Sequence, residues 1–102
     1  MNLITGTEAL EQFCAEQKSA DFIAVDTEFL RDQTYWPKLC LVQVAGPENA
    51  AAIDPLAPGI DLAPLYDLMQ DPAVLKVFHA GRQDLEIFFH ATGKVPDRKS
   101  TR

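Results

Sequence analysis

An apolar run that ends in two closely spaced carboxylates is the feature that most constrains the fold of this chain. Residues 22–29 read FIAVDTEF, a pattern typical of a short buried strand. Strand side chains alternate between faces, so Asp26 and Glu28 are expected to point the same way. Two like charges held together on a core strand repel each other unless a cation lies between them. Oxygen ligands alone favour a hard divalent ion, so the pair predicts a Mg²⁺ or Mn²⁺ site.

A plainer interpretation is that the strand simply ends and that Asp26 and Glu28 are solvated turn residues, because an Asp-x-Glu pair alone is a weak motif. A second acidic position supports the metal site. Residues 74–78 read as another buried strand, and residues 81–91 read as a helix with Asp84 in its first turn, on the apolar face. One explanation is that the helix dipole favours an acid at this N-terminal position. The alternative is that Asp84 lies over the edge of the sheet where the first strand ends with its two acids.

The remaining strands and helices predict a single mixed α/β sheet. Strands are expected at about 22–28, 38–45 and 49–54, and short turns between them imply antiparallel pairing. A short helix at about 62–69 then leads to the strand at 74–78, which should return parallel to the first. The expected fold is therefore a three-stranded meander with one parallel crossover strand and flanking helices.

The first helix is expected at about 8–18, with Thr7 as its N-terminal cap. Leu10, Phe13 and Cys14 fall at helical spacing and predict the buried stripe of this helix.

Composition indicates a folded chain of a reducing compartment. The 102 residues are 47% hydrophobic, and no apolar stretch approaches the roughly 20 residues of a membrane span. Cys14 and Cys40 lack both zinc-site spacing and the density of a secreted scaffold, so both are expected to be reduced packing residues. The N-terminus shows neither a basic leader nor an apolar signal core, which predicts a cytoplasmic protein.

The formal net charge of −6 is unusual for a chain that binds nucleic acid, because non-specific affinity comes from Lys and Arg. Bound metal would offset an acidic pocket, and Arg31, Lys38 and Arg82 lie close in sequence to the candidate site. Each of these cations is also explained as an ordinary surface residue.

Three motifs, in order along the chain, carry a resemblance to a known family. They are the Asp-Thr-Glu at 26–28 after a hydrophobic strand, YWPKLCLVQV at 35–44 and FHAGRQDLE at 78–86. Together they resemble ribonuclease D, a member of the DEDD superfamily of 3′-5′ exonucleases with a ribonuclease H-like fold. The similarity runs from about residue 2 to residue 96.

The resemblance implies two-metal phosphodiester hydrolysis that trims RNA 3′ ends, notably those of transfer RNA precursors. By position, Asp26 would bridge two divalent ions and Glu28 would hold the ion that activates water. Asp84 would help to hold the ion at the leaving 3′ oxygen. Mg²⁺ or Mn²⁺ is the implied cofactor, single-stranded RNA 3′ ends are the implied partner, and no membrane partner is expected.

Substrate contacts are expected around these acids. The residues concerned are Thr27, Phe29, Tyr35, Trp36, His79 and Arg82. Tyr35 and Trp36 either stack on the terminal bases of a single strand or close the sheet edge as hydrophobic plugs. His79 matches a position that the family often fills with His, although without other nitrogen ligands nearby it is better explained as a hydrogen-bonded structural residue.

The sequence also departs from the family pattern. A third family motif, Tyr-x-x-x-Asp, is not found in it, and residues 97–102 contain no apolar side chain. We therefore expect residues 1–96 to form a partial exonuclease domain, residues 97–102 to be a non-native or disordered tail, and catalysis to be weak or absent. The alternative is a non-catalytic remnant or a module that binds nucleic acid or protein. A nucleotide-binding domain is disfavoured because no glycine-rich phosphate loop follows any strand.

Overall fold

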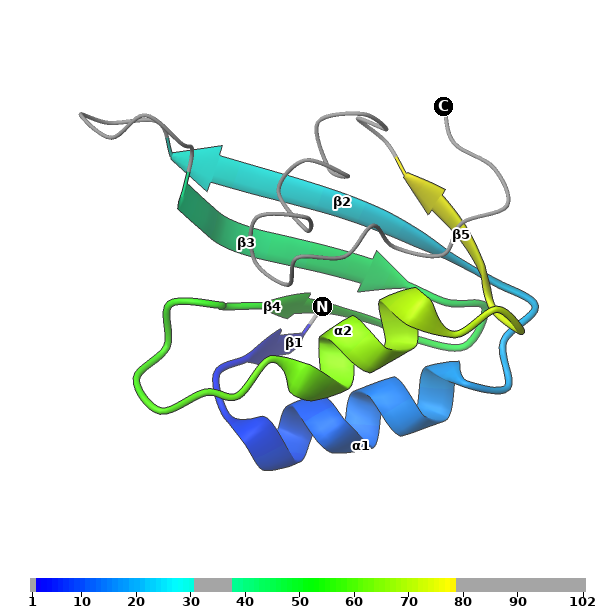
Figure 1. The fold of residues 1–102 in the computed structure, drawn as a ribbon, viewed down its shortest axis with the longest axis horizontal. Coiled ribbons are helices and arrows are strands. Elements are labelled where there is room, and N and C mark those ends of the chain that lie inside the picture. Colours follow the sequence, from blue (N-terminus) through cyan, green and yellow to red (C-terminus); the bar gives the residue numbers. More distant parts are fainter. Residues whose placement is uncertain (1, 31–37, 79–102) are drawn as a thin grey trace.

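The chain folds around a mixed sheet of five strands that carries two helices (Figure 1). The structure, a computed structural model, describes residues 2–30 and 38–78. The elements in these ranges are β1 (Asn2–Ile4), α1 (Thr7–Gln17), β2 (Phe22–Leu30), β3 (Lys38–Ala45), β4 (Ala50–Ile53), α2 (Ala63–Gln70) and β5 (Leu75–Phe78). Neither helix of this described part is long and apolar enough to cross a membrane. The expected loop at 31–37, the expected helix at 81–91 and the tail at 97–102 lie outside the described residues.

The strand order in the sheet is β1-β4-β3-β2-β5. β2 and β3 pair antiparallel, as do β3 and β4, whereas β5 runs parallel to β2. The predicted meander with a parallel crossover strand is therefore confirmed. The sequence analysis missed β1, which pairs parallel to β4 at the edge of the sheet. Its three residues bury only the Ile4 side chain, and so short an alternation gives no readable pattern.

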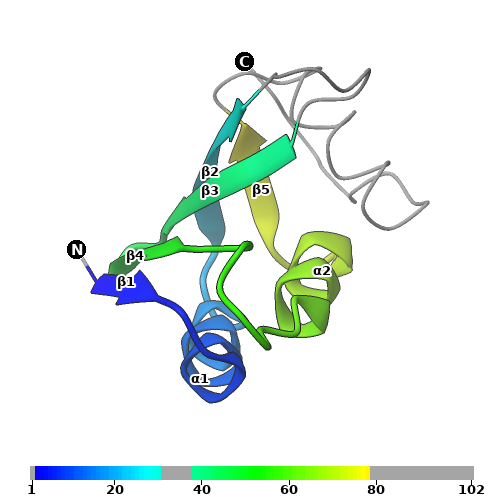
Figure 2. The ribbon, with the colours of Figure 1, turned by 90° about the vertical axis from the view of Figure 1, so that its left-hand side faces the viewer.

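One face of the sheet packs against both helices and forms the core. β2 contributes Ile23 and Val25 to this face, and β3 contributes Val42 and Val44. The helices add Leu10, Phe13, Cys14, Leu65, Leu68 and Met69, so the predicted stripe of α1 is confirmed. Figure 2 shows α1 and α2 on the same side of the twisted sheet. Burial of these apolar side chains is the main favourable term in folding, and it fixes which face of β2 points away from the helices.

The predicted cap of α1 is wrong by one residue. Gly6 occupies the N-cap position in an extended conformation, with φ −135° and ψ 155°, and Thr7 is already helical. The Thr7 hydroxyl instead accepts a hydrogen bond of 2.9 Å from the backbone N–H of Asp61, in the segment before α2. A tertiary contact therefore uses the side-chain oxygen that a local cap would have needed.

Asp71 connects the ends of both helices to β5. Its carboxylate lies 3.5 Å from Lys18 Nζ, just beyond α1, and its backbone carbonyl accepts a hydrogen bond from Lys76 Nζ. A hydrogen bond from the Ala73 N–H holds the pKa of Asp71 below its usual value, against an opposing effect of burial and with help from Lys18. Because the folded pKa is depressed, this stabilisation is present at neutral pH and is lost as the pH falls through the acid range.

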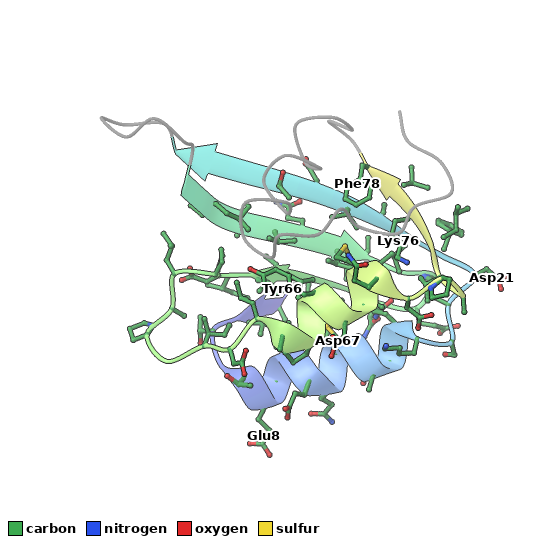
Figure 3. The ribbon with its side chains drawn as sticks, in the orientation of Figure 1. Glu8, Asp21, Tyr66, Asp67, Lys76 and Phe78 are labelled. Carbon is green, nitrogen blue, oxygen red and sulfur yellow. The ribbon has the colours of Figure 1, made fainter. Side chains whose placement is uncertain are left out.

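Lys76 itself is fully buried on β5, beside the end of α2 (Figure 3). A buried ammonium group is tolerated only when it is hydrogen-bonded, and the carbonyl at the end of a helix is a favourable acceptor for it.

A side-chain network joins α1 to the turn between β3 and β4. Gln17 is buried, and its Nε2 donates a hydrogen bond of 2.6 Å to Asn49 Oδ1. The Asn49 amide in turn donates a hydrogen bond of 2.7 Å to Glu16 Oε1. The turn closes through a bond of 2.9 Å from the Gly46 N–H to the Asn49 carbonyl. A methyl group at position 46 would overlap Gln17 Oε1, so an alanine there would force the Gln17 amide to shift.

We expect Gly46→Ala to lower the free energy of unfolding by about 1–3 kcal/mol, because the added methyl group displaces the buried Gln17 amide. The double variant Gly46→Ala/Gln17→Ala should lose less than the sum of the two single variants, since truncation at position 17 removes the overlap. Urea denaturation followed by circular dichroism measures these differences. Gly6→Ala is the control: a Cβ there meets nothing within 4 Å, and a loss below about 1 kcal/mol is expected. Strict additivity of the two single losses would contradict this explanation.

Candidate functional site

The two carboxylates of the first motif lie on β2, on the face that points away from the helices. Ile23, Val25 and Thr27 are buried, whereas Asp26 is half-buried and Glu28 is exposed. This alternation places Asp26 and Glu28 on one face, as the sequence analysis expected. Their side chains therefore remain accessible to an ion or a substrate.

The neighbouring strand lines the same face of the sheet. Asp26 pairs with Gln43 and Glu28 pairs with Leu41, and paired residues of neighbouring strands lie on the same face. Immediately beyond Glu28 the pairing register between β2 and β3 shifts by one residue. Both acids thus lie in the regularly paired stretch of β2, and the irregularity follows directly after Glu28.

Two of the predicted substrate contacts, Thr27 and Phe29, fall on β2. Thr27 lies between the two acids in sequence, and its side chain is buried on the opposite face, with 9% of its surface exposed. Phe29 belongs to the strand and pairs with Leu39. The other predicted site residues, Tyr35, Trp36, His79, Arg82 and Asp84, lie outside the described residues.

Within residues 2–30 and 38–78, no three His, Cys, Asp or Glu side chains gather closely enough to hold a metal ion. The described part of the chain therefore supplies two carboxylates from one strand. Carboxylate oxygens are the ligands that Mg²⁺ and Mn²⁺ prefer, so the donors fit these ions, and open positions are left for other ligands.

The two cysteines play different parts. Cys14 is buried in α1, and desolvation raises the pKa of its thiol to about 11 in spite of the nearby Lys18. It is a neutral packing residue, as predicted. Cys40 is also a free thiol, but it is only half-buried, and its Sγ donates a hydrogen bond of 3.4 Å to the backbone carbonyl of Glu28. Sequence reasoning missed this contact because no spacing rule relates residues that far apart across a strand pair.

Comparison with known proteins identifies the family to which this arrangement belongs. Residues 1–98 match the sequence model of a family described as 3′-5′ exonuclease. Ribonuclease D of Sphingobium indicum is 63% identical over 95 residues, and ribonuclease D of Zymomonas mobilis is 58% identical over 95 residues. Each of these alignments covers 92% of this chain and 24% of the relative, so the chain spans about a quarter of the length of these relatives.

Solved structures agree with these sequence matches. The crystal structure of Escherichia coli RNase D superposes with a TM-score of 0.89 and 40% identity, over 99% of this chain and 27% of that one. The Mg²⁺-bound NrnC of Brucella melitensis superposes with a TM-score of 0.68 and 30% identity, over 94% of this chain and 44% of that one. The fold is therefore ribonuclease H-like, as the sequence analysis expected. The family match over residues 1–98 shows that this chain belongs to the 3′-5′ exonuclease family, and the relatives and the shared fold agree with it.

Proposed function

We propose that this chain provides the first two acidic motifs of an exoribonuclease that removes nucleotides from RNA 3′ ends. The observation that carries the proposal is the placement of Asp26 and Glu28 on one accessible face of β2, in a chain whose residues 1–98 match the 3′-5′ exonuclease family. Two carboxylates on one accessible strand face offer the oxygen ligands that Mg²⁺ and Mn²⁺ prefer.

The proposed roles of the acids follow from their chemistry. Asp26 and Glu28 would hold divalent ions through their carboxylate oxygens, and Asp84 of the second motif would complete the set. Bound Mg²⁺ or Mn²⁺ would supply an activated water and would stabilise charge on the leaving 3′ oxygen. We favour Mg²⁺, since the neighbouring NrnC structure of Brucella melitensis is described with bound Mg²⁺.

RNA is the proposed substrate. Escherichia coli RNase D is described as an exoribonuclease involved in structured RNA processing, and an RNase D of Trypanosoma brucei with the same fold is described in complex with RNA U12. Transfer RNA precursors are the specific substrate that we infer. In this proposal Tyr35 and Trp36 stack on terminal bases, and Thr27, Phe29, His79 and Arg82 complete the substrate contacts.

The proposed compartment is the cytoplasm. The two cysteines are free thiols, which fits a reducing compartment. The ribonuclease D relatives from Sphingobium indicum and Zymomonas mobilis are bacterial proteins.

A Mn²⁺ titration tests the site directly. We expect the chain to bind Mn²⁺ weakly, and we expect the double variant Asp26→Ala/Asp84→Ala to lose that binding, because it removes one carboxylate from each motif. Calorimetry or paramagnetic line broadening measures the affinity. Glu8→Gln is the matched control: Glu8 lies on α1 and points away from the sheet (Figure 3), so its affinity should equal that of the wild type.

The outcome separates the two candidate functions. Mn²⁺ binding by the double variant at wild-type affinity would mean that the acids do not form a metal site, and a non-catalytic binding module would then be the better proposal. Loss of binding in the double variant but not in Glu8→Gln supports the exonuclease site.

A further inference from the structure

We propose that a β-bulge centred on Cys40 positions Glu28 for metal binding, an inference that rests on the function proposed above. Up to Glu28, each step along β2 is matched by one step along β3. At the next step Phe29 pairs with Leu39, so Cys40 has no partner on β2. One extra residue in one strand of an antiparallel pair defines a bulge. Bulges bend the strand, increase its local twist and redirect the neighbouring side chains.

In this chain the bulge keeps Leu39 on the core face, but a strand that lacked Cys40 would bury the same side chains without a bulge. Leu41 pairs with Glu28 and Leu39 pairs with Phe29, so these two leucines lie on opposite faces. Leu39 packs against the core, which fits this assignment. Without Cys40 the two leucines would be consecutive and would take the same opposite faces in a regular ladder. The extra residue therefore changes the direction of the strand end without changing what is buried.

The thiol of Cys40 fixes the backbone at the same place. Its Sγ donates a hydrogen bond of 3.4 Å to the carbonyl of Glu28. The Glu28 backbone sets the direction of the Cα–Cβ bond, and therefore the region that its exposed carboxylate can reach. The hydrogen bond and the bulge thus act on the one residue whose carboxylate must converge with that of Asp26.

Cys40 acts in this proposal as a positioning residue and not as a ligand. A thiolate ligand would favour zinc over the hard ions that carboxylates prefer. Groups that orient a metal ligand commonly change metal affinity about 10–100-fold when they are removed, which sets the size of the expected effect.

Three variants of the chain separate the bulge from its thiol. Deletion of Cys40 keeps every side chain on its face and removes the bulge, so we expect Mn²⁺ affinity to fall about 10–100-fold. Cys40→Ala keeps the bulge and removes the donor, and should lower the affinity by a smaller factor. Cys40→Ser keeps a hydroxyl donor and should restore affinity to near the wild-type value.

A second measurement distinguishes positioning from a general loss of stability. Water-proton relaxation reports how many water molecules coordinate bound Mn²⁺. If Glu28 is withdrawn from the ion, water takes its place, so the Cys40 deletion and Glu28→Gln should raise the relaxation per bound ion equally. A purely structural role would lower the melting temperature and leave this signal at the wild-type value.

The outcomes are distinguishable from a failure of the proposed function. If Glu28→Gln binds Mn²⁺ like the wild type, the assignment of the metal site is wrong, and so are the proposed function and the positioning role of Cys40. If Glu28→Gln weakens binding while the deletion and Cys40→Ala do not, only the positioning role is overturned. Should the deletion prevent folding, as seen by circular dichroism, Cys40→Ala and Cys40→Ser decide the question, because neither changes the length of β3.

Discussion

Asp26→Asn is expected to reduce 3′-5′ hydrolysis of RNA by a factor on the order of 10²–10³ or more, the loss typical of removing one group that stabilises charge in a transition state. The substitution removes the charge at nearly constant shape, so it tests the chemistry of the carboxylate and not its packing. Because the chain spans about a quarter of its ribonuclease D relatives, the assay joins residues 1–96 to the remainder of the Sphingobium indicum enzyme, to which the chain is 63% identical over 95 residues. The readout is the ladder of shortened products from a 5′-labelled oligonucleotide in the presence of Mg²⁺.

Two further variants serve as controls for the effect of Asp26→Asn. Glu8→Gln in the same chimera removes an acid on α1, away from the sheet, and should leave the ladder unchanged. Glu28→Gln should behave like Asp26→Asn, since both acids lie on one face of β2. An active chimera that is insensitive to both β2 substitutions would place catalysis elsewhere. An inactive chimera beside an active parent enzyme would mean that this chain does not supply a competent first half of the site.

Phe78→Ala is expected to lower the free energy of unfolding by about 3–5 kcal/mol, the range for truncation of a fully buried aromatic ring. Phe78 is fully buried at the end of β5 and pairs with Val25 on β2, directly before Asp26 (Figure 3). A small domain is stable by only about 5–15 kcal/mol, so this loss leaves little margin. Chemical denaturation followed by circular dichroism measures it.

Phe22→Ala is the matched control for this prediction. Phe22 starts β2 and pairs with Leu75 at the other end of the same strand pair, but 47% of its surface is exposed. Its truncation should cost less than about 1.5 kcal/mol, because only part of the ring leaves an apolar environment. Equal losses in the two variants would contradict the prediction that burial of the Phe78 ring sets the size of the effect.

Long periodic segments explain why most of the fold could be predicted. α1 shows its apolar residues at helical spacing, and β2 alternates from Ile23 onward, so both elements are readable from local pattern alone. The short edge strand β1 was missed because three residues carry too little pattern. The cap at Thr7 was misassigned since a contact with Asp61, 54 residues away in sequence, uses the hydroxyl.

Some features of the candidate site could likewise be predicted from local sequence, and others could not. The shared face of Asp26 and Glu28 follows from the period of two in a strand, which is a property of the local backbone. The burial of Thr27 between them follows from the same rule once the core face is known. Neither the bulge at Cys40 nor its hydrogen bond to Glu28 can be read from sequence, because strand register depends on where two separate segments meet.

The sequence by itself therefore determined that two carboxylates share one strand face, in a mixed sheet of a chain that matches the 3′-5′ exonuclease family. Local periodicity is enough for the shared face, because it depends on neighbouring residues, whereas the family rests on the resemblance of the motifs. Only the tertiary structure decided the contacts between elements: Lys76 buried against the end of α2, Gln17 packed over Gly46, and the extra residue of β3 next to the partner of Glu28. These contacts join residues from different elements, and their energies are decided by packing and hydrogen bonding that no single segment contains.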